Sequence, residues 1–549
     1  METQRIFLAI ALSLGILLGY QYFFVPPPPP VSETVQSSQT NEQAAPGDAG
    51  QPSIPSPNLM ANPAAQVLPA GTGRDITVET SLFSAVLTEN GGGVKSFQLK
   101  EYRESLDENS VAKELVHTRV EEGLPLVFSW GVQPGGMQPI AYESATERLE
   151  VAKGGTAELV MRGKLSDGVE IVRSMRMDDQ QYLIEIVFDI KNATGAVLQG
   201  APYLALDNRP FDKTGDKQFV FSGPAVLMDG VLEEIDAGDL KKKGSRSFTG
   251  RIGWAAYEDN YFFCGIVPQS GEQHTAHFSG SGDNKVTTVL AGAADSLNPG
   301  ATLQYKYLFY FGPKEISTLK AVGHELDRSV NFGWFDIMAK PTLYLLNFFY
   351  KYVGNYGVAI ILVTVLIKLL FWPIAQKGMK SMKTMQKLQP KMAKLREKYK
   401  DDKQKQQEEM IKLYQTYKVN PVGGCLPMLI QIPVFFALYK VLLQTIELRH
   451  APFFLWITDL AAPDRLFIGV DIPFLGGIPV LTLLMGASMF LQQKMTPATG
   501  DPTQQKVMMF MPVIFTFMFL NFASGLVLYW FVNNLLSIAQ QYLINRQSD

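Results

Sequence analysis

The sequence predicts a multi-domain membrane protein with six transmembrane helices, an all-β sandwich domain outside the cytoplasm, and a cytoplasmic helical hairpin. Three observations predict this class. Several apolar runs are long enough to cross a bilayer. Short runs of alternating apolar and polar residues fill the region from Asp75 to about Phe311. Residues 375–420 hold thirteen Lys or Arg and five Asp or Glu, a local net charge of +8 in a chain whose formal net charge is -3.

The amino-terminal region, residues 1–25, is predicted to be a transmembrane anchor. Ile6–Val25 is a run of 20 mostly apolar residues after Arg5. It is longer than the apolar core of a usual signal peptide, and no small-residue cleavage motif closes it. An uncleaved anchor with a cytoplasmic amino terminus follows, with a cleaved signal peptide as the alternative. Residues 26–74 are predicted to be a flexible linker, because they hold eleven prolines and almost no aromatic residue.

Residues 75–330 are predicted to form the external β-sandwich. Glu158–Leu165, Val169–Met177 and Tyr182–Lys191 alternate apolar and polar residues, as half-buried strands do. Turn sequences such as Ser166-Asp167-Gly168 separate them. Many short strands at this spacing favour a sandwich.

The region after residue 330 is predicted to lie at and within the membrane. Residues 331–353 are expected to form an interfacial helix, because charges and Pro341 interrupt their apolar pattern. Residues 354–374 form the second transmembrane helix, 375–420 the basic hairpin, and 421–549 the remaining four transmembrane helices and a cytoplasmic tail. With basic loops inside, both termini are cytoplasmic. The four later spans are expected at Pro421–Leu443, Gly476–Leu491, Val507–Phe522 and Gly525–Leu543.

Lys368 is the most informative residue of the sequence. It lies within Val358–Trp372, a run otherwise interrupted only by Thr364. An ionisable side chain within a span is costly unless it faces protein or water, so Lys368 indicates a functional site. The alternative is that Lys368 snorkels, with its ammonium at the headgroups.

Polar residues on other spans favour a site over snorkelling. In a helical projection of the last span, at 100° per residue, seven polar and aromatic side chains fall within one sector of about 140°. Gln431 on the third span and Thr364 on the second lie at overlapping depths. We predict a hydrated substrate groove, with interhelical hydrogen bonding alone as the alternative. The residues of this sector are Tyr529, Trp530, Asn533, Asn534, Ser537, Gln540 and Gln541.

Two further patterns concern the fourth and fifth spans. Gly476–Leu491 and Val507–Phe522 are short for a span, which is compatible with local thinning of the bilayer. Methionines gather on these two helices, and flexible thioethers suit either an adaptable apolar slide or ordinary gap-filling. The methionines assigned to the slide are Met485, Met489, Met508 and Met511.

The basic hairpin is predicted from an apolar seam, Met385 to Tyr399, at coiled-coil spacing, and a returning face formed by Met410, Ile411, Tyr414 and Tyr417. Its cations suit two partners, anionic lipid and ribosomal RNA, and both stay open. The exposed lysines expected to act there are Lys387, Lys391, Lys394 and Lys398.

No catalytic residue, metal ligand or cofactor site is predicted. Cys264 and Cys425 are the two cysteines, and no disulfide between them is expected. A secondary transporter is a rival class, but it would require inverted repeats that the spans do not display. A carbohydrate-active enzyme in the β domain is a third class, supported only by fold analogy.

Four sequence motifs stand out in the membrane region. They are Asn420-Pro421-Val422-Gly423-Gly424-Cys425-Leu426-Pro427, Gln431-Ile432-Pro433, Phe510-Met511-Pro512 and Ser524-Gly525-Leu526-Val527-Leu528-Tyr529-Trp530. These motifs resemble the YidC family of membrane protein insertases, related to the mitochondrial Oxa and chloroplast Alb proteins. The similarity spans nearly the whole chain except the linker.

The resemblance also assigns individual positions. The family's groove cation, usually Arg, falls on Lys368, and other important positions fall on Thr364, Gln431, Tyr529 and Trp530. Trp530 replaces a frequent Tyr, and Ala523 stands where Pro is common.

The resemblance implies an insertase and chaperone of the bacterial inner membrane with its large domain in the periplasm. It implies nascent membrane proteins as clients and association with the Sec translocon. Inner-membrane lipids are further partners, and we expect a monomeric functional unit.

Overall fold

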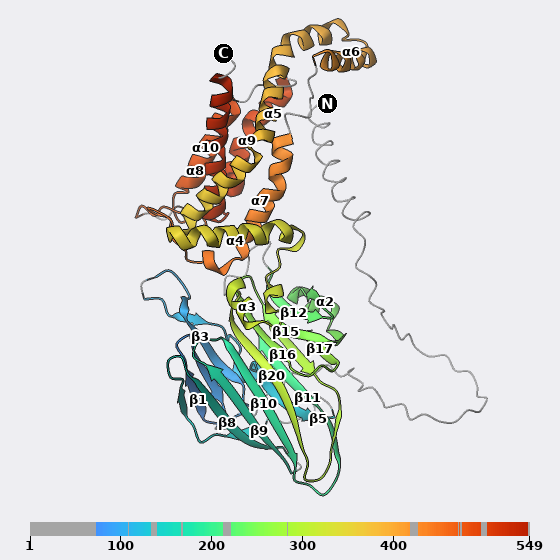
Figure 1. Cartoon of the computed structure of the whole chain (residues 1–549), viewed down its shortest axis with the longest axis vertical. Helices are drawn as coiled ribbons and strands as arrows, with labels where there is room; N and C mark the ends of the chain where they lie inside the picture. The colour runs from blue at the N-terminus through green and yellow to red at the C-terminus, as the bar shows by residue number, and fades with distance from the viewer. Residues whose placement is uncertain are drawn as a thin grey trace, which may run out of the picture. The chain divides into compact units, whose positions relative to one another are not determined.

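The computed structural model describes residues 73–107, 109–132, 140–165, 168–211, 221–282, 284–417, 426–469, 472, 475–495 and 502–546. The expected anchor Ile6–Val25, nearly all of the linker, and Cys425 lie outside these residues. Figure 1 shows the described chain as a β-rich domain and a set of long helices.

The β-rich domain is built on a nine-stranded sheet of order β13-β12-β15-β16-β20-β10-β9-β8-β6, in which neighbouring strands are antiparallel. Its strands are β6 (Ala141–Glu143), β8 (Thr156–Leu165), β9 (Val169–Asp178), β10 (Leu183–Asn192), β12 (Gly223–Met228), β13 (Val231–Glu234), β15 (Ile252–Glu258), β16 (Phe262–Pro268) and β20 (Thr302–Pro313).

Two smaller sheets complete the domain. A five-stranded sheet has the order β4-β3-β2-β1-β7, with β1 and β7 parallel, and a six-stranded sheet has the order β14-β17-β18-β11-β19, with β5 beside β11. Their strands are β1 (Asp75–Glu79), β2 (Phe83–Thr88), β3 (Val94–Arg103), β4 (Ala112–Glu114), β5 (Val127–Gly131), β7 (Arg148–Glu150), β11 (Leu198–Asn208), β14 (Arg246–Gly250), β17 (His274–Gly280), β18 (Val286–Ala291) and β19 (Asp295–Leu297).

Aromatic side chains join the sheets into a sandwich. Phe97 of β3 stacks on Phe311 of β20 with ring centroids 4.7 Å apart, and Phe128 of β5 stacks on Phe188 of β10 at 3.8 Å. Burial of such rings removes a large apolar area from water. The β-rich character expected for this region is therefore confirmed, and Cys264 lies buried on β16 with a free thiol.

The helical region begins with α4 (Asp336–Val353), which follows the β-rich domain after the short helix α3 (Ile316–Val322). α4 contains Pro341 and ends at Gly354, which adopts a left-handed conformation (φ 63°) that suits glycine at a helix end. α5 begins after Asn355, whose side chain accepts a hydrogen bond from the amide of Val358 at 3.1 Å. The helices are α2 (Ala237–Lys243), α3 (Ile316–Val322), α4 (Asp336–Val353), α5 (Tyr356–Lys398), α6 (Lys403–Thr416), α7 (Leu426–Gln444), α8 (Val480–Met495), α9 (Pro502–Phe519) and α10 (Ser524–Arg546).

One continuous helix runs through the position expected for the boundary between the second span and the hairpin. α5 continues through Pro373 and Pro390 as one helix of 43 residues. A proline removes one backbone hydrogen bond but does not end a helix whose following turns contain strong helix formers such as Lys, Gln and Met. Within the described residues, α5 is the one helix long and apolar enough to cross a membrane, and shorter apolar stretches lie at Gln431–Gln444 and Met508–Phe519.

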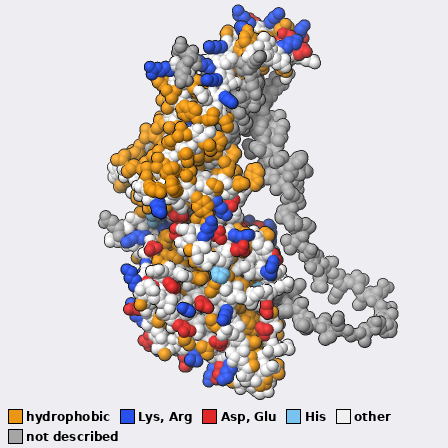
Figure 2. Space-filling model, in the orientation of Figure 1, with side chains coloured by type: hydrophobic (Ala, Val, Ile, Leu, Met, Phe, Trp, Pro, Cys, Tyr) orange, Lys and Arg blue, Asp and Glu red, His pale blue; other side chains and the backbone are white. Residues whose placement is uncertain are grey.

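α5, α7, α8, α9 and α10 pack side by side, with α10 against both α5 and α8. Figure 2 shows hydrophobic side chains gathered over these helices, and basic side chains near α6. The second half of α5 packs against α6 through Met385, Leu388 and Met392, which contact Met410, Leu413 and Tyr414. Leu413, and not Ile411 as expected, packs against α5, because residues 410, 413, 414 and 417 share one helical face. Ile411 lies off this face and is 50% exposed.

Candidate functional site

Lys368 lies at a crossing between α5 and α10. Its ammonium is 2.6 Å from the hydroxyl oxygen of Ser537 and 3.2 Å from the side-chain oxygen of Asn533. The side chain is half-buried. Among the described residues Lys368 forms no ion pair with a carboxylate. The ammonium is therefore held by neutral oxygen atoms, with no carboxylate partner in the part of the chain that the structure describes.

The helical spacing of α10 builds this cradle. Asn533 and Ser537 are four residues apart, so they lie one turn apart on the same face. The hydroxyl of Ser537 donates a hydrogen bond to the backbone oxygen of Asn533 at 2.8 Å, which leaves its lone pairs free to accept from Lys368. The backbone of α10 thereby orients the hydroxyl toward the ammonium.

The remaining polar residues of α10 contact other neighbours. The amide nitrogen of Asn534 donates to the hydroxyl of Ser488 on α8 at 3.0 Å, and Gln541 donates to the backbone oxygen of Met495. Gln540 donates to the backbone oxygen of Trp372 on α5 at 3.4 Å. Asn534 and Gln541 are buried. The polar sector of α10 thus divides, with one part facing α5 and another fastening α8.

Three of the expected site residues meet on the side of α10 that faces α7. The hydroxyl of Tyr529 is hydrogen-bonded to the side chain of Gln431, which is half-buried on α7. Trp530 is also half-buried and packs edge-on against Phe435 of α7, with ring centroids 4.8 Å apart. Gln431 and Trp530 therefore offer an amide and an indole that are still partly accessible.

Thr364 is 1% exposed, and its hydroxyl donates to the backbone oxygen of Ile360 at 2.6 Å. It lies one turn before Lys368 on α5. Its hydrogen-bond donor is satisfied within its own helix, as is common for Thr in membrane helices.

The four methionines assigned to a slide fall in two environments. Met485 is fully buried and Met489 is partly buried, both within α8. Met508 and Met511 on α9 are 39% and 36% exposed. α9 also exposes Phe510 and Phe517, so of the four methionines only the two on α9 lie on an exposed apolar face.

All four basic-hairpin lysines, Lys387, Lys391, Lys394 and Lys398, are exposed along the second half of α5. The ammonium of Lys391 donates to the hydroxyl of Tyr417 and lies 4.5 Å from the centroid of its ring. This contact joins the two helices on the side where the lysines lie.

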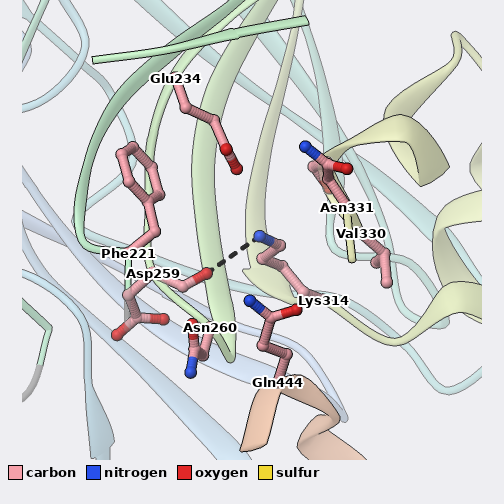
Figure 3. Close-up of a pocket in the computed structure, with 9 residues that line it drawn as sticks. Phe221, Glu234, Asp259, Asn260, Lys314, Val330, Asn331 and Gln444 are labelled. Carbon is pink, nitrogen blue, oxygen red and sulfur yellow. Dashed lines mark hydrogen bonds between the residues drawn. The ribbon is translucent and has the colours of Figure 1, made fainter. Parts of the chain in front are cut away.

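A polar pocket is lined by residues of the β-rich domain and of the segment after it, together with Gln444 at the end of α7 (Figure 3). Lys314 forms an ion pair with Glu258 at 3.0 Å and donates to the backbone oxygen of Asp259 at 3.0 Å. Burial raises the pKa of the nearby Glu234 carboxyl. The pocket is lined by Phe221, Glu234, Asp259, Asn260, Lys314, Ser329, Val330, Asn331 and Gln444. The ammonium of Lys314 is already paired with Glu258, so this pocket, unlike the site at Lys368, has its cation neutralised by a carboxylate.

Sequence reasoning missed two positions that shape the site. Ser488 of α8 is the partner of Asn534, and its own hydroxyl donates to the backbone oxygen of Met485 at 2.6 Å. Gly486 permits close approach of α8 and α9, because a Cβ atom there would lie 2.1 Å from the hydroxyl oxygen of Thr516. The sequence signal for this contact is a small residue, Gly486, on one apolar helix and a polar residue, Thr516, on the next.

A helix long and apolar enough to cross a membrane, packed with shorter apolar helices and joined to a β-rich domain, is typical of a membrane protein. Two family models match the chain. One described as "60Kd inner membrane protein" matches residues 348–549, and one described as "YidC periplasmic domain" matches residues 75–345.

Named relatives cover the whole length. "Membrane protein insertase YidC" of Geotalea daltonii is 39% identical, with 99% of this chain and 99% of the relative covered. The protein of the same name from Maridesulfovibrio salexigens is 40% identical, with 100% and 99% covered. A crystal structure described as an active YidC insertase with its first transmembrane domain resolved is 19% identical, covers 88% of this chain and 95% of its own, and gives a TM-score of 0.36.

The chain belongs to the YidC family of membrane protein insertases. It is an inner-membrane protein with a periplasmic domain, and its function is membrane protein insertion.

Proposed function

We propose that the chain crosses the membrane six times with both termini in the cytoplasm, and that it inserts clients through a polar groove beside Lys368. The basic residues of α5 and α6 support the orientation, since cytoplasmic loops are enriched in Lys and Arg. α7, α8, α9 and α10 would provide four spans, α5 one, and Ile6–Val25 the sixth.

The observation that carries the groove is the unneutralised ammonium of Lys368, held by the oxygens of Asn533 and Ser537. An acidic residue at the centre of a bilayer costs about 2.5–3.5 kcal/mol on insertion scales. A nearby cation with no counter-ion offsets part of this cost. The polar segment of a client would therefore replace neutral partners of Lys368 without having to break an existing ion pair.

Three half-buried residues form the contact surface of the groove: Lys368, Gln431 and Trp530. They offer a cation, an amide and an aromatic ring, which together accept acidic, polar and apolar parts of an unfolded segment. The hydrophobic part of the client would pass over the exposed face of α9, where Met508 and Met511 lie. Flexible thioethers accept partners of varied shape.

The exposed lysines on the second half of α5 would hold the hairpin near anionic lipid, and they also suit the phosphates of ribosomal RNA. Family resemblance adds the Sec translocon as a partner. We also expect a monomer to be the functional unit.

Site-specific photocrosslinking tests the groove. A photoreactive residue at Gln431 is expected to crosslink a ribosome-stalled client, because its side chain is half-buried beside Tyr529. The matched control is Leu535, which lies on α10 and is 44% exposed. Crosslinks at Leu535 with none at Gln431 would contradict a polar route.

A further inference from the structure

The segment that joins α7 to α8 has an unusual distribution of polar and apolar side chains. This segment, residues 445–479, is called the outer loop below, and its described part is 445–469, 472 and 475–479. Four large apolar side chains point outward. Leu455 is 88% exposed, Phe467 is 64% exposed, and Phe454 and Ile468 are each 56% exposed.

The charged side chains near the outward-facing residues turn the other way. Asp464 is 2% exposed and accepts hydrogen bonds from the indole of Trp456 at 2.7 Å and from the backbone amide of Thr482 at 3.1 Å. Asp459 accepts from the backbone amides of His450 and Ala461. A loop in water normally exposes its charges and buries its rings, so this polarity is inverted.

Arg465 also turns toward the protein. Its guanidinium donates to the backbone oxygen of Leu520 at 2.8 Å and to the side-chain oxygen of Asn521 at 2.9 Å. These contacts bind the outer loop to the turn between α9 and α10. The guanidinium of Arg465 is thereby fixed against the ends of α9 and α10.

Further contacts place the outer loop at the periplasmic ends of the helices. Asn355, at the start of α5, donates to the backbone oxygen of Phe453 at 3.2 Å, and the ring of Phe453 lies against Gly357. The matched periplasmic domain ends at residue 345, shortly before α5 begins at Tyr356. The outer loop therefore lies at the level where this helix leaves the membrane on the periplasmic side, close to α4 (Figure 1).

The backbone at Leu455 is strained. Leu455 has φ 59°, in the left-handed region that bulky residues rarely adopt. The amide of Ile457 donates to the backbone oxygen of Phe454, and that of Phe453 donates to the oxygen of Ile457, closing a tight turn around it. Such a conformation is unfavourable for a leucine, so its presence calls for a role of the side chain.

We propose that the outer loop inserts Phe454, Leu455, Phe467 and Ile468 into the headgroup and upper acyl region of the periplasmic leaflet. The occupant is lipid, because these side chains continue the lipid-facing apolar surface of the helices at their ends. Within the described part of the outer loop no exposed cation accompanies the tip at Phe454 and Leu455, so the attraction is apolar and independent of headgroup charge. Burial of such side chains by about 5–10 Å is typical of interfacial anchors.

Depth-dependent fluorescence quenching tests the proposal. Cys264 and Cys425 are replaced by Ala, and single cysteines at Leu455 or Phe467 carry an environment-sensitive fluorophore. The full chain is reconstituted into vesicles of phosphatidylethanolamine and phosphatidylglycerol, and separately into phosphatidylcholine. Nitroxide lipids labelled at carbon 5 or carbon 12 quench from inside the bilayer, and iodide on both sides quenches from water.

The matched control is Val197, which lies in the β-rich domain and is 56% exposed. Lipid quenching by the carbon-5 nitroxide is expected to be at least about twofold stronger at Leu455 than at Val197, and stronger than quenching by the carbon-12 nitroxide. The result should be the same in both lipid mixtures. Iodide quenching at Leu455 equal to that at Val197, without nitroxide quenching, overturns the proposal.

Protection of Leu455 in native membranes but not in the purified vesicles would show that a protein covers the outer loop, and this also overturns the proposal. A second variant separates anchoring from folding. Leu455→Gly removes the side chain but suits the left-handed backbone, so thermal stability in detergent is expected to stay equal or rise. Nitroxide quenching of a fluorophore at the neighbouring Phe454 is then expected to fall by about half. Unchanged quenching in this variant contradicts an anchoring role for Leu455.

Discussion

The ammonium of Lys368 on α5 lies 2.6 Å from the hydroxyl oxygen of Ser537 on α10, two residues separated by 169 positions in the chain. With Asn533, this contact satisfies a cation without neutralising it. A membrane helix that holds such a charge at a crossing retains the capacity to attract an acidic group. This capacity is the physical basis of the proposed groove.

Ser537→Ala tests whether the hydroxyl positions Lys368. The matched control is Ser488→Ala, which removes another buried interhelical hydroxyl, the partner of Asn534. Each change is expected to lower stability by about 0.6–1.7 kcal/mol. Insertion of a client with an acidic translocated tail and of a client with a neutral tail is measured by protease protection in proteoliposomes. Only Ser537→Ala should lower the ratio of acidic-tail to neutral-tail insertion. An equal ratio in the two variants would remove Ser537 from the site.

The close approach of α8 and α9 predicts a double-mutant effect. Gly486→Ala places a methyl group 2.1 Å from the hydroxyl oxygen of Thr516, so one of the helices must shift. Overpacking of this kind costs about 1–3 kcal/mol. Thr516→Ala removes the obstructing atoms, and the double variant is expected to recover most of the lost thermal stability. Additive losses in the double variant would show that the two residues do not meet.

The buried pair of Glu258 and Lys314 predicts a pH-dependent stability. Burial raises the pKa of Glu258 from 4.5 to about 7, although Lys314 opposes the shift. The folded state therefore binds more protons than the unfolded state between these values, and stability is lost as pH rises from about 4.5 to about 7. The loss is at most about 3 kcal/mol.

Glu258→Gln is expected to flatten this profile. Unfolding of the full chain in detergent, followed between pH 5 and pH 8, measures the slope. Glu143→Gln is the control, because Glu143 is exposed on β6. A slope that is the same in Glu258→Gln and in the unmodified protein would assign the pH dependence to other groups.

The lysines on the second half of α5 predict an electrostatic contact. Replacing all four by Gln is expected to weaken binding to anionic vesicles by about 1 kcal/mol per lysine at low salt. Co-sedimentation with ribosomes in the absence of lipid distinguishes the second partner. The replaced residues are Lys387, Lys391, Lys394 and Lys398.

A control variant neutralises four exposed lysines of the β-rich domain, and its binding should be unchanged. Equal losses in the two variants would indicate a nonspecific effect of net charge. The control residues are Lys153, Lys164, Lys241 and Lys242.

Sequence patterns predicted the β-rich domain because alternation along Val169–Met177 and Tyr182–Lys191 reflects burial on one face of a strand. They also singled out Lys368 and the polar sector of α10. They could not show which residues of that sector face α5 and which face α8, since a helical projection gives the direction of a side chain but not the identity of the neighbouring helix. Ser537 meets α5 and Asn534 meets α8, a distinction set by long-range packing.

The continuity of α5 was not foreseen from the sequence. The helix runs through Pro373 into the basic region, because a proline is tolerated where the following turns favour helix. The inverted polarity of the outer loop depends on tertiary contacts of Asp464 and Arg465. No local pattern encodes those partners.

Charge reversal at Lys368 tests the central claim most directly. Two clients that differ only in carrying Asp or Lys in the translocated tail are inserted by the unmodified protein and by Lys368→Glu in proteoliposomes. The account predicts that the unmodified protein favours the Asp client and that Lys368→Glu favours the Lys client. Equal loss of both clients in Lys368→Glu, at unchanged thermal stability, would contradict an electrostatic role for this residue.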